Sequence, residues 1–398
     1  MEIKVAVIGA GNCCKSLVEG VSFYSGNSAS RIPGLTFAEI GGYRCEHIKF
    51  VAAWDVDARK VGQPLHVAIN QLPNCAMTIK SDASDVCENT IVRMGPVLDG
   101  VGPLMPSYTP SETFIVSTQI PDSPETIVRI LTEQKVDVIL NYLPVGSQLA
   151  TEFYMNCALT AKVAVVNCIP VFIASDPVWE QKFINAGLPI IGDDMRSQFG
   201  ASIMSAVLQE LMFSRGIDVQ VHYQDNIGGN TDFLNMQDKQ RLVSKKISKE
   251  NVIKQQNIIN GVEIKPNTIH AGPASYFPAL GDNKRAHFLI KAEGFGGSPI
   301  ELTADLSVQD SPNSAGVVID ALRLIKVARE MNIVGALHGA SAFTQKTPPI
   351  DMSPSLAYQE VKNLAERKFT TFTEVMVKDK NPNAEQLVKY FKSLVTRK

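Results

Sequence analysis

The stretch from Asn226 to Lys249 joins a glycine-containing loop to a segment whose lysines recur at helical spacing. Lys245 and Lys249 are four residues apart, so on a helix their ammonium groups share a face. Two like charges at this spacing cost about 0.2–0.5 kcal/mol unless an anion or an acid lies between them. Taken alone, the lysine segment fits a solvated basic face that includes Lys246. The glycine-containing loop just upstream favours a site for a phosphate or an enolate instead.

The loop before these lysines has residues suited to binding an anion. Gly228 and Gly229 allow positive backbone φ angles, which would let successive N–H groups converge on one anion. Asn230 and Asp232 follow and supply polar side chains where a helix would start. We therefore expect a loop, a helix start and a lysine-bearing helix in that order.

The composition is that of a globular protein with two domains. The chain has 398 residues, and 45% of them are hydrophobic, which is enough for substantial cores. A formal net charge of −2 gives no long-range attraction to nucleic acid or to an anionic membrane, so we expect neither as a partner. The N-terminus leads directly into a strand and no run approaches 18 apolar residues, so we expect a cytoplasmic protein. Seven cysteines without ligand spacing indicate reduced thiols.

The N-terminal segment resembles a dinucleotide-binding fingerprint. Residues 3–8, IKVAVI, predict a strand buried on both faces, and GAGNCC follows at residues 9–14. The first two glycines of the fingerprint are present, and Cys14 replaces the third, so the motif is incomplete. A nucleotide pyrophosphate at the next helix start is the favoured interpretation. The residues predicted to contact it are Gly9, Gly11, Asn12 and Cys13.

The acidic residue that normally follows this fingerprint lies further along the chain than usual. Asp55 ends a second predicted strand, KFVAAWDVD at residues 49–57. We assign it to the ribose hydroxyls, which favours NAD over NADP because a carboxylate repels a 2′-phosphate. A surface aspartate in a strand-end turn explains the same position equally well.

Strands and helices then alternate, which predicts an α/β fold with a doubly wound parallel sheet. Strands are expected at residues 136–143, 162–168 and 188–192, and helices near 122–134, 147–160 and 176–186. Loops at the carboxyl ends of such strands hold ligands. We therefore add to the cofactor site Pro144, Gly146, Ser147 and Asp193.

The composition changes after residue 196, where longer polar strands begin. Alternating patterns at 218–226, 287–295 and 299–310 predict an inserted α+β domain, with the last two strands paired around Gly296-Gly297. Ser311-Pro312-Asn313-Ser314 should cap an apolar helix that returns to the first domain. The predicted domains are an NAD-binding Rossmann domain at 1–196 with an insertion at about 62–118, a catalytic and oligomerisation domain at 197–310, and a return with a C-terminal tail at 311–398.

Five segments together carry a family resemblance. GDDMRSQFGAS, NIGGNTDFLNM, SKKISK, LGDNKRAHF and QDSPNSAGVVID occur in the order and approximate spacing of the myo-inositol-1-phosphate synthase (inositol-3-phosphate synthase) family, and the sequence resembles its shorter bacterial and archaeal members. The resemblance runs from the N-terminal glycines to about residue 350. Arg196 stands where the family usually has lysine, and Ser202 where threonine is common.

The resemblance implies an isomerase that converts D-glucose 6-phosphate to 1D-myo-inositol 3-phosphate, also called L-myo-inositol 1-phosphate. In this reaction NAD oxidises C5, a proton leaves C6, the enolate attacks the C1 aldehyde, and the hydride returns to C5. The implied fold is a Rossmann domain with a catalytic domain that assembles a homotetramer. The family uses a divalent or a monovalent cation in different members, and this sequence has no metal-specific spacing.

The resemblance also implies site residues. The lysines, as compact cations, suit an enolate, a C1 alkoxide and a phosphate. The residues that match catalytic positions are Lys245, Lys249, Lys284, Lys346, Asp194, Asp232 and Asp310. Those that match the substrate-phosphate loop are Ser197, Gln198, Gly200, Ala201 and Ser202. By their local sequence alone, Lys284 and Lys346 would be exposed turn residues and Asp310 a helix cap.

Two other functions fit parts of the sequence. An ordinary NAD-dependent dehydrogenase of a phosphorylated substrate would share the first domain and release NADH. A protein that senses NAD without catalysis would also need only that domain. Clustered lysines argue against the sensor, because ammonium groups packed together cost stability unless a reaction uses them.

Overall fold

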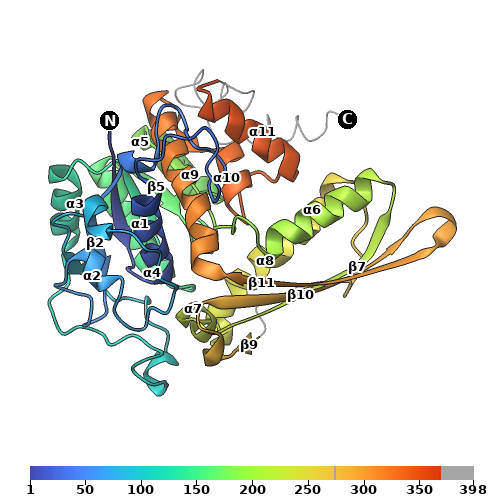
Figure 1. Ribbon diagram of the computed structural model, residues 1–398, viewed down its shortest axis with the longest axis horizontal. Helices are drawn as coiled ribbons and strands as arrows, with labels where there is room; N and C mark the ends of the chain where they lie inside the picture. The colour runs from blue at the N-terminus through green and yellow to red at the C-terminus, as the bar shows by residue number, and fades with distance from the viewer. Residues whose placement is uncertain (273–274, 369–398) are drawn as a thin grey trace.

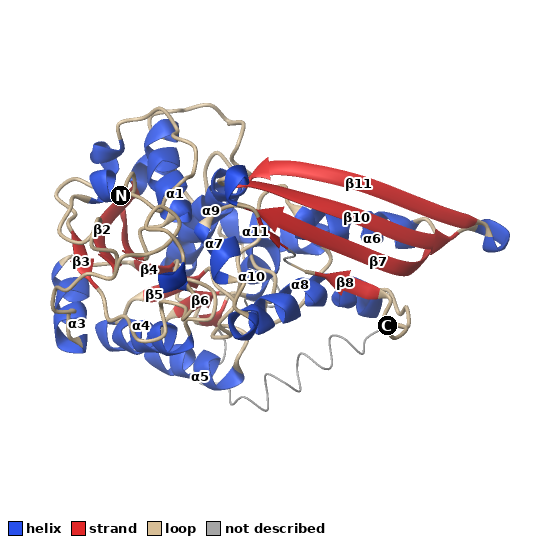
Figure 2. Cartoon of the chain, turned by 90° about the horizontal axis from the view of Figure 1, so that it is seen from below, coloured by secondary structure: helices blue, strands red, loops and turns tan. Residues whose placement is uncertain are grey.

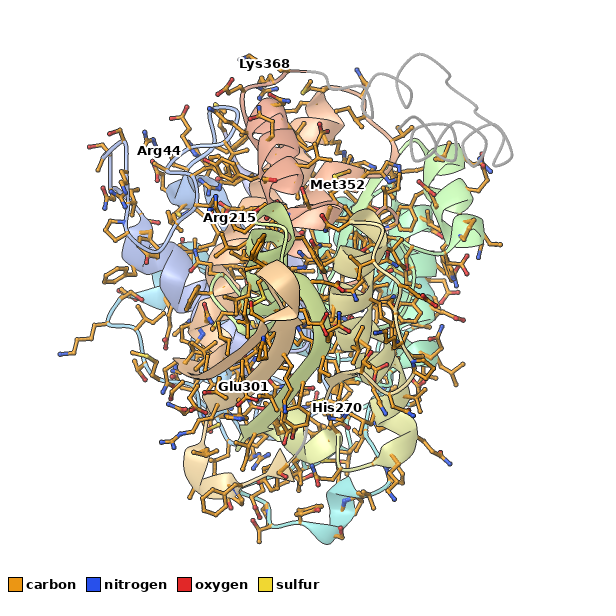
Figure 3. All side chains as sticks on the ribbon, turned by 90° about the vertical axis from the view of Figure 1, so that its right-hand side faces the viewer. Arg44, Arg215, His270, Glu301, Met352 and Lys368 are labelled. Carbon is orange, nitrogen blue, oxygen red and sulfur yellow. The ribbon has the colours of Figure 1, made fainter. Side chains whose placement is uncertain are left out.

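The computed structural model describes residues 1–272 and 275–368, and these residues form two sheets with their helices. The first sheet and its helices form a compact body, and the second sheet projects from it as a long, narrow layer (Figures 1 and 2). Figure 3 looks onto the hairpin end of that layer, where Glu301 of one edge strand is labelled.

The first sheet has, in the described chain, seven parallel strands in the order β12-β6-β5-β4-β1-β2-β3. This confirms the predicted α/β doubly wound sheet, and the order reverses between β1 and β4, where such sheets bind ligands. Its strands are β1 (Ile3–Ile8), β2 (Ile48–Asp55), β3 (Val92–Met94), β4 (Val138–Asn141), β5 (Ala164–Asn167), β6 (Pro189–Ile191) and β12 (Gly335–Ala336).

Helices cover both faces of this sheet because its strands are apolar on both sides. One buried cluster joins the sheet to α1 (Asn12–Tyr24) and α9 (Asp310–Glu330), and the other joins it to α3 (Pro124–Glu133), α4 (Gln148–Ala161) and α5 (Pro177–Ala186). The range 62–118, expected as an insertion, also contributes the edge strand β3, which pairs with β2. Its other short elements are α2 (Leu65–Ala68), η2 (Ala83–Val86) and η3 (Met105–Ser107), and η1 (Cys45–His47) precedes β2.

The second sheet has the order β11-β10-β7-β8, with β9 paired to β7. Its strands are β7 (Asp218–Gly228), β8 (Ile269–Ala271), β9 (Ser275–Tyr276), β10 (Asn283–Glu293) and β11 (Pro299–Gln309). The antiparallel pairing of β10 with β11 confirms the predicted hairpin. Gly296 and Gly297 at its turn have positive φ angles of 66° and 76°, in the short helix η5 (Phe295–Gly297).

Two long helices associate with this sheet. They are α6 (Ala201–Ser214) and α8 (Lys239–Ile259), which pack on each other. The lysine segment is helical as predicted, because α8 begins after Asp238, whose carboxylate accepts the Gln240 N–H. Asn230 caps the short helix α7 (Thr231–Asn235). The remaining elements are η4 (Pro278–Leu280), α10 (His338–Thr344) and α11 (Pro354–Ala365).

Gly228 and Gly229 are glycines for a different reason from the one predicted. Neither has a positive φ angle. A Cβ on Gly228 would lie 2.5 Å from the Phe233 ring, and one on Gly229 would lie 2.4 Å from the Phe277 carbonyl oxygen. The prediction of a positive-φ anion loop was therefore wrong, and the two glycines instead permit close packing at the end of β7.

The start of α9 also differs from the prediction. The helix begins at Asp310, so the SPNS sequence lies inside its first turn rather than capping it. Pro312 fits there, because a first-turn residue needs no N–H donor, and the Asp310 carboxylate favours the positive end of the helix. Residues 369–398, which include most of the predicted tail, lie outside the described residues. Among the described helices, none is long and apolar enough to span a membrane.

The close approach at Gly229 predicts the effect of adding one methyl group. Gly229→Ala should lower the free energy of unfolding by about 1–3 kcal/mol, because the neighbouring atoms are backbone and cannot turn away. Gly20→Ala in α1 is the matched control, since an added Cβ would meet no described atom within 4 Å and should stabilise by up to about 1 kcal/mol. Urea denaturation measures both, and equal stabilities would contradict the packing argument.

Candidate active site

A large cleft lies at the carboxyl edge of the first sheet, between that sheet and the second one. Gly11 and Tyr142 line it from the ends of β1 and β4, at the point where the strand order reverses. Asn226 and Lys284 line it from β7 and β10 of the second sheet, and Lys249 lines it from α8. The cleft therefore joins the predicted nucleotide site to the predicted lysine site.

The centre of the cleft is the Asp194 carboxylate, which binds two lysines. Its Oδ1 accepts from Lys245 Nζ and from Lys346 Nζ, each at 3.0 Å, and its Oδ2 accepts from Ser248 Oγ at 2.6 Å. Burial alone would raise the Asp194 pKa, but the two ammonium groups outweigh burial and hold this pKa well below its usual value. Asp194 thus lies between Lys245 and Lys346, and it forms no ion pair with Lys249, the lysine that the helical spacing places beside Lys245.

The same carboxylate affects its two lysines differently. Burial lowers the Lys245 pKa, but the charges of Asp194 and Asp232 outweigh it and raise that pKa above its usual value. For Lys346, burial prevails and lowers the pKa to about 8, with Lys245 adding to the shift. Lys245 is therefore a permanent cation near neutral pH, and Lys346 can exchange a proton.

The second ion pair of the cleft joins Lys284 of β10 to Asp310 in the first turn of α9. The Asp310 pKa is below its usual value, because the charge of Lys284 outweighs burial. Both side chains line the cleft, so neither is the exposed turn residue or simple cap that its local sequence allowed. Asp232 lines the same wall.

Of the four lysines that line the cleft, Lys249 is the one that forms no ion pair with a described carboxylate. It is 8% exposed and lines the cleft. Burial lowers its pKa well below the usual value, and the charges of Lys284, Lys245 and Lys346 lower it further. A neutral amine in this position can accept a proton, so Lys249 has the properties of a general base.

The glycine loop after β1 has the geometry that a dinucleotide needs. Gly9 has a φ angle of 96°, and a Cβ there would lie 2.7 Å from the Tyr142 carbonyl oxygen. At Gly11 an added Cβ would meet no described atom within 4 Å, so the loop is open on that side. Within the described chain no side chain caps the first turn of α1, which leaves its N–H groups for an anion.

Asp55 lies in a smaller pocket that adjoins the cleft and is also lined by Gly9 and Gly11. Its Oδ2 accepts the Ala10 N–H at 2.7 Å, and its Oδ1 accepts the Val56 N–H at 2.7 Å. The carboxylate thus supports the glycine loop as well as facing the pocket. The predicted ribose contact remains compatible with this position.

Two other predicted cofactor residues line the large cleft. Asn12 Oδ1 accepts the N–H groups of Cys75 and Ala76, at 2.7 and 2.8 Å. Cys13 accepts from Ser314 Oγ at 3.7 Å, and burial raises the pKa of its thiol to about 12. Cys13 is therefore a neutral thiol and not a nucleophile.

The loop after β4 is held by the lysine helix. Arg241 of α8 donates to the Val145 carbonyl oxygen at 2.8 Å and to Ser147 Oγ at 3.3 Å. Gly146 has a φ angle of 87°, and a Cβ there would lie 2.9 Å from Arg241. Pro144 lines both pockets, whereas Gly146 and Ser147 support the loop from behind.

The start of α6 is the second place where free N–H groups face the cleft. Gly200 precedes α6, and none of the described side chains caps the helix. Ser197, Gly200, Ala201 and Ser202 all line the cleft. Donors of this kind at a helix N-terminus suit a phosphate group.

Comparisons with known proteins identify the family of this chain. A sequence profile described as myo-inositol-1-phosphate synthase matches residues 200–311. An inositol-3-phosphate synthase of Mycolicibacterium smegmatis is 42% identical over 368 residues, which cover 92% of this chain and 98% of the relative. One of Mycobacterium tuberculosis is 43% identical over 363 residues, covering 91% and 95%. The chain belongs to the myo-inositol-1-phosphate synthase family.

A solved structure supports the same assignment. A myo-inositol-1-phosphate synthase-related protein of Thermotoga maritima is 25% identical and superimposes with a TM-score of 0.73, covering 93% of this chain and all of that one. The family resemblance expected from the sequence is therefore confirmed, and this member of the myo-inositol-1-phosphate synthase family is an enzyme.

Besides Gly146 and Ser147, two predicted site residues of this family member line neither pocket. Asp193 is fully buried, and its carboxylate accepts from Asn167 Nδ2 at 2.7 Å and from the Ile173 N–H at 2.9 Å. Gln198 packs against Gly316 and donates to the Gly34 carbonyl oxygen at 2.7 Å. Both side chains are oriented away from the ligands predicted for them and fix the loops instead.

The sequence prediction also missed residues that complete the site. Ser248 lies one helical turn after Lys245, a spacing that could have revealed it. Asp282, two residues before Lys284, accepts from Asn230 Nδ2 at 3.0 Å and from Ser311 Oγ at 2.8 Å. Over residues 1–272 and 275–368, no group of three or more His, Cys, Asp or Glu side chains is arranged to hold a metal ion.

The unequal pairing of the lysines predicts opposite effects on stability. Asp194→Asn should lower the free energy of unfolding by about 3–5 kcal/mol, because it leaves two buried ammonium groups without their carboxylate. Lys249→Met should raise it by about 0.5–2 kcal/mol by removing a buried amine that its neighbours repel. Chemical denaturation at neutral pH measures both.

The sign of the pH dependence checks the cause. Because the folded-state pKa of Lys249 is depressed, the unfolded wild type binds more protons there, so its stability relative to Lys249→Met rises with pH. The advantage of the variant should therefore shrink from pH about 7 towards about 10. A constant difference would contradict the depressed pKa.

Proposed function

We propose that the enzyme converts D-glucose 6-phosphate to 1D-myo-inositol 3-phosphate with NAD that is recycled in place. The observation that carries this proposal is the convergence, in one cleft, of a dinucleotide-type glycine loop with Lys245, Lys249, Lys284 and Lys346. A sensor needs the loop but has no use for clustered buried lysines. A dehydrogenase is distinguished from the isomerase by the release of NADH. The names of the similar synthases support the same reaction.

The first-sheet residues fit a bound NAD. The open side of Gly11 and the uncapped start of α1 suit the pyrophosphate, and Asp55 suits the adenosine ribose. Pro144 continues the binding surface toward the lysines. Bound NAD supplies the reversible removal of hydride from C5 of the open-chain sugar phosphate.

The lysines supply the proton transfers and the charge stabilisation. Lys249, whose pKa is lowered by burial and by its lysine neighbours, is the base that takes a proton during enolisation at C6. Lys245 stays charged and stabilises the negative oxygen that develops during ring closure. Lys284 is held by Asp310, and we assign it to the oxygen at C5.

The phosphate of the substrate belongs at the start of α6. The N–H groups there and the Ser197 and Ser202 hydroxyls provide donors without adding another buried charge. A phosphate dianion would also offset the excess of lysine charge in the cleft.

We further propose, from the resemblance, a cytoplasmic homotetramer assembled through the second domain. Chelation and salt exchange test whether the reaction requires a divalent or a monovalent cation.

The products formed with limiting NAD test this function. With glucose 6-phosphate and substoichiometric NAD, the enzyme should complete many turnovers to an inositol phosphate without a net rise in NADH absorbance. Proton and phosphorus NMR identify the product. The recycling scheme returns each hydride, so product should exceed cofactor. Stoichiometric NADH with an oxidised sugar would identify a dehydrogenase, and NAD binding without turnover would favour the sensor.

The proposed role of Lys249 predicts that its removal lowers kcat without weakening NAD binding. Lys249→Ala should lower kcat by at least about 100-fold, as expected for loss of a general base. Lys246→Ala is the control, because Lys246 is on the same helix with its side chain 54% exposed. Steady-state kinetics and NAD titration separate the two effects. A Lys249→Ala enzyme within a few-fold of wild type would remove Lys249 from the mechanism.

A further inference from the structure

Residues 102–119, here called the strap, lead from the second-sheet side of the cleft to the edge of the first sheet. One end is fixed directly after β2. The Ser117 N–H donates to the Val56 carbonyl oxygen at 2.8 Å, and the Ala58 N–H donates to the Ile115 carbonyl oxygen at 2.6 Å. This end therefore lies beside Asp55 and the pocket assigned to the adenosine ribose.

The middle of the strap is fixed to the second sheet by a contact here called the latch. Tyr276 of β9 donates its hydroxyl to Glu112 Oε1 at 2.9 Å. The rings of Tyr108 and Tyr276 meet edge to face with centroids 6.3 Å apart, and Thr231 Oγ1 lies 3.5 Å from the Glu112 carbonyl oxygen. These contacts connect the two halves of the molecule through β9, in addition to the close approach between Gly102 at the start of the strap and Arg241 of α8.

Phe114 lies between these two fixed points. It lines the small pocket that contains Asp55 and also the large cleft that contains the lysines. Gly11 and Leu143 are shared by the two pockets in the same way. A ligand that extends from Asp55 past Gly11 to the lysines must therefore pass Phe114.

We propose that the strap, closed by the Glu112–Tyr276 latch, retains the dinucleotide between the two halves of the reaction. This inference rests on the proposed function, because a recycled cofactor must stay bound after it has taken the hydride. Loss of NADH at that point would release an oxidised sugar phosphate and leave the hydride unreturned. Glu112 and Tyr276 are positioning residues, since they act through Phe114 and the strap.

The latch is suited to opening as well as to closing. Glu112 and Tyr276 are both partly exposed, so water can replace their hydrogen bond when the cofactor exchanges. Thr109 Oγ1 donates to the other oxygen of the Glu112 carboxylate at 2.6 Å, which orients it toward Tyr276. The contact is a single hydrogen bond between two partly exposed side chains, and the Tyr276 ring also packs against the small apolar cluster that contains Phe233.

The dissociation rate of NADH tests the latch without relying on turnover. Tyr276→Phe and Glu112→Ala should each raise the NADH dissociation rate roughly tenfold, because each removes one charge-assisted hydrogen bond. Cofactor fluorescence after rapid dilution measures this rate. Glu112→Gln should stay near wild type because its amide oxygen can still accept from Tyr276. Ser107→Ala is the control on the strap, since among the described residues that hydroxyl donates to the Leu104 carbonyl oxygen alone.

The double variant and the product ratio complete the design. Tyr276→Phe combined with Glu112→Ala should release NADH no faster than either single variant, because both remove the same bond. During turnover both single variants should release more free NADH per inositol phosphate, which a loss of stability alone would not cause. Wild-type dissociation rates in both single variants overturn the inference. Failure of wild type to recycle NAD overturns the proposed function, and the dissociation rates still decide the latch.

Discussion

The fold depends on one buried carboxylate that three parts of the chain must reach. Asp194 follows β6 at the carboxyl edge of the first sheet, Lys245 and Ser248 come from α8, and Lys346 follows α10. A buried carboxylate without partners would be protonated or would destabilise the fold. Each of the three segments must therefore be in place before the others are stable, so the site and the joint between the domains form together.

That joint also fixes the distribution of charge. Lys245 and Lys346 share Asp194, and Lys284 pairs with Asp310, whereas Lys249 forms no ion pair with a described carboxylate. The amine that remains is buried among cations, which is the condition that lowers a lysine pKa most. The basicity of Lys249 is thus set by its surroundings, because burial and three nearby lysine charges lower its pKa. Arg241, one turn before Lys245, extends the same helix to the cofactor loop.

The sequence was sufficient to predict features that depend on a local residue pattern. It was not sufficient to predict which way a side chain is oriented or which distant residue it contacts. The buried strands and the lysine helix were predicted correctly because their periodicity is written in consecutive residues. The partner of Lys245 could not be predicted by spacing, since Asp194 is 51 residues away. Asp193 and its neighbour Asp194 are oriented to opposite environments, one into a loop and one into the cleft. A glycine pair likewise indicates small size or positive φ, and only the surrounding atoms decide between them.

In the proposed mechanism, cofactor retention and the low pKa of Lys249 both depend on the strap closing the cleft. Phe114 of the strap and Lys249 of α8 line one cleft, so water that entered past Phe114 would reach the environment that keeps Lys249 neutral. Hydration raises the pKa of a buried lysine toward its usual value and removes its capacity to accept a proton. Under the proposed mechanism, opening of the strap would both free the dinucleotide and hydrate Lys249. The proposal therefore links cofactor retention to the low pKa of Lys249, because one closure would hold the dinucleotide and exclude water from the amine.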